Sequence, residues 1–133
     1  MASIRHERRI RAPADVVWHL IARPESIVEW FPGVVSATVD GAFRTITLAS
    51  GIVMPEEILT IDALQRRFAY RITAPLYRFH LGVIDVIEVG EDDSLCVYST
   101  TAEPDALALI VAGGTIGALS EIQRLAEASA KGD

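Results

Sequence analysis

From Val34 onward the hydrophobic pattern changes its period once, at Pro104, and this change constrains the fold more than any other feature. Between Val34 and Ala102, turn signals such as Asp40-Gly41 and Ser50-Gly51 separate six stretches that have the composition of strands. These predicted strands cover roughly residues 34–39, 42–49, 52–61, 68–74, 79–89 and 95–102. After Pro104, apolar or small side chains recur at helical spacings, at Leu107, Val111, Gly114, Ala118, Ile122 and Leu125. The pattern therefore predicts an antiparallel meander followed by one long helix.

The residues before the meander predict another strand and a short helix. The segment Ser3–Arg11 alternates one row, Ile4, His6, Arg8 and Ile10, with a second row, Arg5, Glu7 and Arg9, which predicts a strand. Pro13 suits the first position of a helix, and Glu25–Phe31 predicts a further turn of helix. The order strand, helix, six-stranded meander and long helix is an α+β layout, in which the terminal helix covers one sheet. The Gly113-Gly114 pair is expected to kink or split that helix.

Composition and charge exclude several classes of protein. The 133 residues predict one domain over 1–133, with a frayed tail at 129–133, and 50% hydrophobic residues indicate a globular chain. A single cysteine excludes an internal disulfide, and the histidines lack metal-ligand spacing, so neither a metal nor a cofactor is expected. The net charge of −6 argues against nucleic acid as a partner. No signal peptide or transmembrane segment is visible, because the apolar run Ala106–Leu119 is too short to span a bilayer, and a cytoplasmic location is expected.

Hairpin geometry predicts which side chains of the third and fourth strands face inward. A two-residue turn at Ser50-Gly51 would place Arg44 opposite Glu57 within an otherwise apolar row. Such a pair has two interpretations. It is either a polar clamp for a ligand carbonyl or carboxyl, with Glu57 as an acid or base, or an ion pair that fixes the register of the hairpin.

The strand over 79–89 contains a second charged residue in an apolar row. Its odd positions are apolar except for Asp85, so the odd row is predicted to face the core. A carboxyl in such a place has a raised pKa and can act as a general acid or base. The alternative is that Asp85 faces water, or pairs with Arg8 or Tyr98. On the strand over 68–74, Tyr70 falls in the apolar row and is expected to point inward.

A series of short motifs resembles the polyketide cyclase/dehydrase-like branch of the START-like (Bet v 1-like, SRPBCC) superfamily. The matching residues, in order, are Ile10-x-Ala12-Pro13-Ala14-x-x-Val17-Trp18, Trp30-x-Pro32-Gly33, Gly41-x-x-Arg44, Gly51, Glu57-x-x-x-x-Asp62 and Tyr70. The resemblance covers about residues 3–127 and implies a helix-grip fold. In that fold a curved seven-stranded antiparallel sheet wraps a long C-terminal helix around an internal apolar cavity. Members of the superfamily bind lipids, steroids, polyketides or plant hormones, and some are enzymes.

The chain departs from the aromatase/cyclase members of the superfamily at three positions. Leu59 stands where those enzymes carry a catalytic arginine, and Asp85 and Tyr98 stand where they carry tryptophans. The arginine-based mechanism of those enzymes is therefore not expected in this chain.

These observations lead to one functional hypothesis with alternatives. The chain is expected to bind a small hydrophobic molecule, such as a polyketide, lipid or isoprenoid-like compound, through Trp30, Arg44, Tyr70 and Tyr98. If it is an enzyme, the candidate catalytic residues are Glu57 and Asp85, and the reaction is a cyclisation, dehydration or isomerisation. The alternatives are a non-catalytic carrier and a protein-interaction module with the same fold, either as a monomer or as a homodimer.

Overall fold

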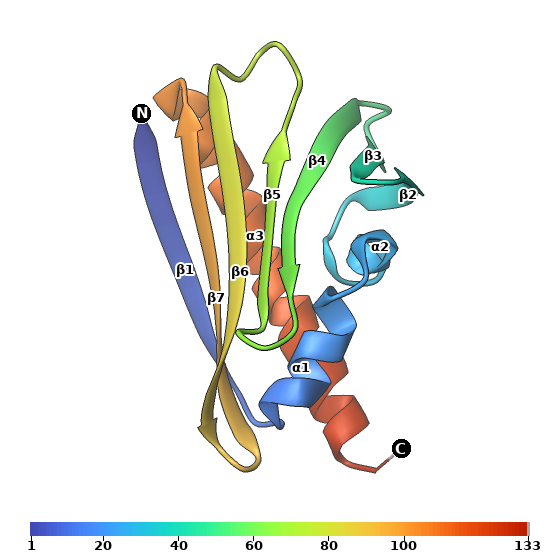
Figure 1. Ribbon diagram of the computed structural model, residues 1–133, viewed down its shortest axis with the longest axis vertical. Coiled ribbons are helices and arrows are strands. Elements are labelled where there is room, and N and C mark those ends of the chain that lie inside the picture. The colour runs from blue at the N-terminus through green and yellow to red at the C-terminus, as the bar shows by residue number, and fades with distance from the viewer. Residues whose placement is uncertain (133) are drawn as a thin grey trace.

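The computed structural model describes residues 1–132 and shows a seven-stranded antiparallel sheet that curves around one long helix (Figure 1). The elements along the chain are β1 (Ala2–Ile10), α1 (Ala14–Ile21), a 3-10 turn (Pro24–Ser26), α2 (Ile27–Trp30), β2 (Val34–Asp40), β3 (Phe43–Leu48), β4 (Val53–Asp62), β5 (Arg67–Ile72), β6 (Phe79–Gly90), β7 (Asp93–Glu103) and α3 (Asp105–Ala130). This is the predicted α+β helix-grip arrangement, and each meander strand begins and ends within two residues of its predicted bounds.

The order of the strands across the sheet is β1-β7-β6-β5-β4-β3-β2. Each strand of the meander pairs with the next strand in sequence, while β1 pairs with β7 at one edge. Helices α1 and α2 connect β1 to β2, and α1 packs against α3 at one end of the sheet (Figure 1). We call the face of the sheet toward α3 the inner face, and the opposite face the outer face.

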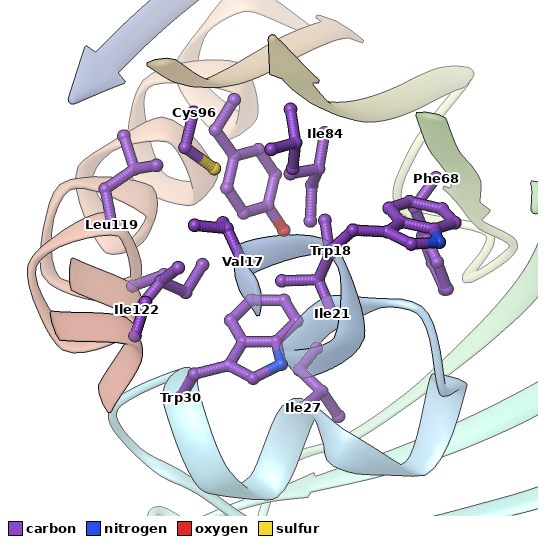
Figure 2. Close-up of a cluster of buried hydrophobic side chains, with 14 of the residues drawn as sticks. Val17, Trp18, Ile21, Ile27, Trp30, Phe68, Ile84, Cys96, Leu119 and Ile122 are labelled. Atoms are coloured by element: carbon purple, nitrogen blue, oxygen red, sulfur yellow. The ribbon is translucent and has the colours of Figure 1, made fainter. Parts of the chain in front are cut away.

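The core lies between the inner face, α1 and the C-terminal half of α3. Figure 2 shows Val17 and Ile21 of α1 gathered with Ile122 of α3 and with Ile84 and Cys96 of the sheet, and all five are at most 1% exposed. Removing this much apolar surface from water is the dominant favourable contribution to folding. The packed end of the molecule therefore provides a rigid support for the more open end described below.

Helix α3 is continuous through the Gly113-Gly114 pair, so the pair does not split the helix. Its helical structure extends to Ala130 and so includes the first two residues of the predicted tail, and Asp133 lies outside the described residues. By length and apolar composition α3 would be able to cross a bilayer, a criterion that the core helix of a soluble protein also meets. In this structure α3 packs against β1 and β7.

The register of the β3–β4 hairpin differs by one residue from the predicted register. Arg44 stands opposite Glu56, not opposite Glu57. The reason is a three-residue loop, since the Leu48 amide donates to the Ile52 carbonyl at 2.8 Å and Gly51 adopts a φ of +90°. A shift of one residue exchanges the two faces of a strand. Glu56 therefore points inward and Glu57 points outward.

The two faces of β6 are also exchanged relative to the prediction. The even residues His80, Ile84 and Val86 are buried on the inner face, whereas the odd residues Ile87 and Val89 are about half exposed on the outer face. The prediction that the odd row faces the core is therefore wrong, and Asp85 lies on the outer face with that row.

Candidate functional site

An apolar cavity of about 330 Å³ lies between the N-terminal half of α3 and the sheet strands β3, β4 and β5. Its lining consists of aliphatic and aromatic side chains with few polar groups: Ile27, Phe31, Val34, Ile46, Leu48, Ile52, Met54, Glu56, Tyr70, Ile72, Leu76, Tyr77, Leu107, Ile110, Val111 and Gly114. The lining contains one ionisable carboxyl group, that of Glu56. Mostly apolar walls with a few placed polar groups are typical of small-molecule sites.

Glu56 is held at the cavity wall by a buried ion pair with Arg44. The Arg44 Nε donates to Glu56 Oε1 at 2.7 Å, and the side chains of Arg44 and Glu56 are 1% and 5% exposed. The Arg44 Nη1 donates to the Pro24 carbonyl at 2.9 Å, which ties β3 to the turn before α2. The guanidinium carbon also lies 5.5 Å and 5.2 Å from the ring centres of Phe68 and Tyr70. Arg44 is thereby fixed in position and in turn fixes Glu56.

The surroundings of Glu56 make its proton exchangeable near neutral pH. Burial raises the pKa of this carboxyl to about 6, and the opposing attraction of Arg44 keeps it from rising further. Oε1 accepts the hydrogen bond from Arg44, while no residue within 1–132 donates to Oε2. A carboxylate with one free oxygen beside an apolar cavity is able to accept a hydrogen bond from a ligand or to transfer a proton.

Two buried tyrosines stand next to this ion pair. The hydroxyl oxygens of Tyr70 and Tyr98 lie 2.5 Å apart, and both side chains are buried. Burial raises the pKa of both phenols, so both stay protonated at neutral pH. Tyr70 lines the cavity, whereas Tyr98 packs behind it, edge-on to Trp30 and Phe31 at centroid distances of 6.4 Å and 6.5 Å.

The predicted ligand-binding residues take three different places. Tyr70 lines the cavity, Arg44 supports Glu56 from behind, and Trp30 and Tyr98 lie in the wall beneath the lining. The Trp30 indole donates to Ser26 Oγ at 3.2 Å, which orients it into the core (Figure 2). Its neighbour Phe31 contributes to the lining instead. Direct ligand contact by Trp30, Arg44 and Tyr98 remains a prediction.

The two candidate catalytic carboxylates point away from the cavity. Glu57 accepts a hydrogen bond from Arg71 Nε at 2.7 Å, and Asp85 accepts hydrogen bonds from Arg67 at 2.7 Å and 3.2 Å, all on the outer face. Their predicted inward orientation is wrong, because β4 is shifted by one residue and the inner face of β6 is its even row. The buried carboxylate is that of Glu56, which a two-residue turn would place on the outer face. Gly51, a residue type suited to the left-handed position of a three-residue loop, is the signal in the sequence for the correct register.

The described part of the chain contains no candidate metal site. Within residues 1–132 no three His, Cys, Asp or Glu side chains form a group suited to a metal ion. The Nδ1 of His80 accepts the Ile72 amide at 2.9 Å, and burial lowers the pKa of its imidazole to about 4. His80 is therefore a neutral structural residue that takes the place of a backbone acceptor where β5 and β6 separate.

Comparison with known proteins gives one family and several similar folds. A sequence profile described as "Polyketide cyclase / dehydrase and lipid transport" matches residues 1–127. No curated protein sequence matches the chain.

Three solved structures illustrate the similarity. The protein XoxI from Bacillus cereus is 24% identical with a TM-score of 0.88, and the match covers 95% of this chain and 96% of that one. An uncharacterised protein from Bacillus thuringiensis is 26% identical with a TM-score of 0.85, over 92% of this chain and 97% of that one. Norcoclaurine synthase from Thalictrum flavum, solved as a point mutant with a transition-state analogue, is 18% identical with a TM-score of 0.75, over 94% and 93% of the two chains.

Proposed function

This chain belongs to the polyketide cyclase/dehydrase and lipid transport family, and on that premise we propose that it binds one small hydrophobic molecule in the cavity beneath α3. The observation that carries the proposal is the cavity itself, which is apolar except for the polar groups of Glu56, Tyr70 and Tyr77. A protein-interaction module needs no such cavity, so the binding of a ligand is the better interpretation of this end of the fold.

The size of the cavity limits the ligand. About 330 Å³ is at the lower end of the roughly 300–1,000 Å³ that small-molecule pockets occupy. A compact isoprenoid, a short polyketide or a single acyl chain fits this range better than a complete phospholipid. Each methylene group moved from water into the cavity contributes about 0.8 kcal/mol to binding, so affinity rises with the apolar part of the ligand.

Binding in the cavity is tested with a blocking variant and a matched control on the same helix. Val111 lines the cavity, whereas Leu109, two residues earlier on α3, is 63% exposed and lies outside the lining. Val111→Trp should abolish the binding of N-phenylnaphthylamine, an uncharged fluorescent probe, while Leu109→Trp should bind it as the unmodified protein does. Equal probe binding by both variants, or no probe binding by the folded unmodified protein, would contradict the proposal.

The pKa of Glu56 favours one second candidate, an acid–base enzyme. A carboxyl that titrates at about 6 is able to take a proton from carbon and return it to another carbon of the same ligand, which is an isomerisation. The test uses the molecule that the protein retains from its own host, identified by native mass spectrometry and extraction. Incubation in heavy water should place deuterium on one carbon of that molecule, and Glu56→Gln should prevent it. A ligand recovered without deuterium from the unmodified protein indicates a carrier.

A further inference from the structure

We infer that the polar end of the cavity, formed by Glu56 and Tyr70, is a receptor for a single hydroxyl group. This inference rests on the proposed function and narrows it, because it makes the ligand an alcohol or a phenol on an apolar skeleton. It excludes a plain hydrocarbon, a carboxylic acid and a protonated amine as the preferred ligand.

Glu56 supplies a hydrogen-bond acceptor. Its Oε1 is occupied by Arg44, while Oε2 receives no hydrogen bond from any residue in 1–132. Glu56 lines the cavity, so this second oxygen is available to accept a hydrogen bond from a ligand hydroxyl.

Tyr70 supplies a hydrogen-bond donor, because its hydroxyl accepts the proton of Tyr98 and keeps its own proton for another acceptor. The two hydroxyls lie 2.5 Å apart, so one proton is shared between them and the other needs an acceptor elsewhere. Tyr98 is fully buried behind the lining, where the described residues offer its proton no other acceptor, whereas Tyr70 is one of the residues that line the cavity. Each hydroxyl proton has an acceptor when Tyr98 donates to Tyr70 and Tyr70 donates to a ligand in the cavity.

Glu56 and Tyr70 are neighbours on the inner face of the sheet. Glu56 stands opposite Ile72 and Ile58 opposite Tyr70 in the β4–β5 pairing, so Glu56 and Tyr70 are diagonal neighbours on the inner face. Arg44 touches both, since its Nε is 2.7 Å from Glu56 Oε1 and its guanidinium carbon is 5.2 Å from the Tyr70 ring centre. A hydroxyl between the two residues accepts from Tyr70 and donates to Glu56.

Other polar groups satisfy this end of the cavity less well. A carbonyl accepts from Tyr70 but leaves Glu56 without a donor, and an ether does the same. A ligand carboxylate is repelled by the ionised Glu56, and the charge of Arg44 is already neutralised by its pair with Glu56. A protonated amine would add a second cation to a buried pair that is already neutral, and would leave one positive charge in excess.

The experiment compares four small molecules of one skeleton type: thymol, its methyl ether, p-cymene and cuminic acid. Each displaces N-phenylnaphthylamine from the cavity, near neutral pH. Thymol should bind about tenfold more tightly than p-cymene, which lacks only the hydroxyl, because two hydrogen bonds are gained in a dry site. The methyl ether and the acid should not exceed p-cymene. Equal binding of thymol and p-cymene, or tighter binding of cuminic acid, overturns the inference.

Variants assign the preference to the two residues. Tyr70→Phe should reduce the preference for thymol to a few-fold or less while p-cymene binds unchanged, and Glu56→Gln should also reduce it. Glu57→Gln is the matched control, since Glu57 is adjacent in sequence but lies on the outer face. If Glu56→Gln fails to fold, Tyr70→Phe still decides the question, and an unchanged thymol preference in that variant overturns the inference. Failure of all four molecules and of the probe to bind contradicts the proposed function instead.

Discussion

The ring of Tyr70 lies directly over Gly82, its cross-strand partner on β6, where a methyl group at Gly82 would stand 2.6 Å from the ring atoms Cε1 and Cζ. No side chain other than the hydrogen of glycine fits beneath this ring. The close approach seats Tyr70 in the inner face, so that its hydroxyl reaches Tyr98 and its ring lines the cavity. The position of Tyr70 thus depends on the absence of a side chain at Gly82 on the neighbouring strand.

Gly82→Ala should destabilise the fold and displace Tyr70. The added methyl group overpacks a site that has no room, at a cost of about 1–3 kcal/mol in the free energy of unfolding. Gly90→Ala on the same strand is the control, because a methyl group there meets only Asp93 Cβ at 3.6 Å, which is ordinary contact. Urea denaturation measures both, and equal unfolding free energies for the two variants would show that Tyr70 can move at no cost.

Arg44→Met should be strongly destabilising, because it leaves Glu56 buried without its partner. Breaking one side of a buried pair costs about 3–5 kcal/mol, whereas breaking an exposed pair costs about 1 kcal/mol or less. Arg71→Met, which breaks the exposed Arg71–Glu57 pair, is the matched comparison. The double variant Arg44→Met with Glu56→Leu should recover most of the loss, and urea denaturation of all four proteins measures it. A loss for Arg44→Met no larger than for Arg71→Met would argue against a buried charge pair.

The stability of the protein should carry a pH dependence that belongs to Glu56. Burial raises the pKa of this carboxyl to about 6 in the folded chain, above the value of about 4.3 for a free glutamate. The folded chain therefore holds the proton more tightly than the unfolded chain does. The resulting contribution favours folding below about pH 4, and on the order of 2 kcal/mol of it is lost as the pH rises through about 6.

The measurement is the difference in unfolding free energy between the unmodified protein and Glu56→Gln, taken across this pH range. As the pH rises, the unmodified protein should lose unfolding free energy relative to Glu56→Gln. Its unfolding free energy relative to Glu57→Gln should not change with pH. Because all other titrating groups are common to the proteins compared, a flat difference for Glu56→Gln as well would mean that the pKa of Glu56 is not raised.

Glycines 113 and 114 in α3 should respond in opposite ways to the same substitution. A methyl group at Gly113 meets nothing within 4 Å, so Gly113→Ala should stabilise the helix by about 0.5–1 kcal/mol. A methyl group at Gly114 stands 3.0 Å from the ring of Phe31, which lines the cavity. Gly114→Ala should therefore gain less stability and weaken probe binding, because Phe31 shifts into the cavity. Thermal unfolding and probe titration measure the two effects, and identical behaviour of the two variants would contradict the contact with Phe31.

Glu57→Gln and Asp85→Asn should leave ligand binding unchanged, even though the sequence marks both residues as candidate acids. Each accepts hydrogen bonds from an outer-face arginine that is about half exposed, Arg71 or Arg67. Exposed pairs of this kind contribute about 0–1 kcal/mol, so the stability loss should also be small. Probe titration and urea denaturation check both expectations, and a loss of binding in either variant would contradict the placement of that residue outside the site.

The amino-acid sequence by itself determined the order and the limits of the elements. Strand and helix periods, the turn at Asp40-Gly41 and the proline before α3 are local signals, and each acts over a few residues. They are sufficient to predict a seven-stranded sheet and a covering helix, and the inward direction of Tyr70 follows from the same periodicity.

The tertiary structure decided which faces of β4 and β6 line the cavity, and hence which carboxylate is buried. One additional residue in the loop at Gly51 turns Glu56 inward in place of Glu57. The alternation of residues within a strand does not reveal how many residues the loop contains. On β6 the inner row holds His80 and Gly82 and is less apolar than the outer row, because a glycine makes room for Tyr70 and a histidine accepts a backbone amide. Both requirements arise from the neighbouring strand β5, so no pattern within β6 contains them.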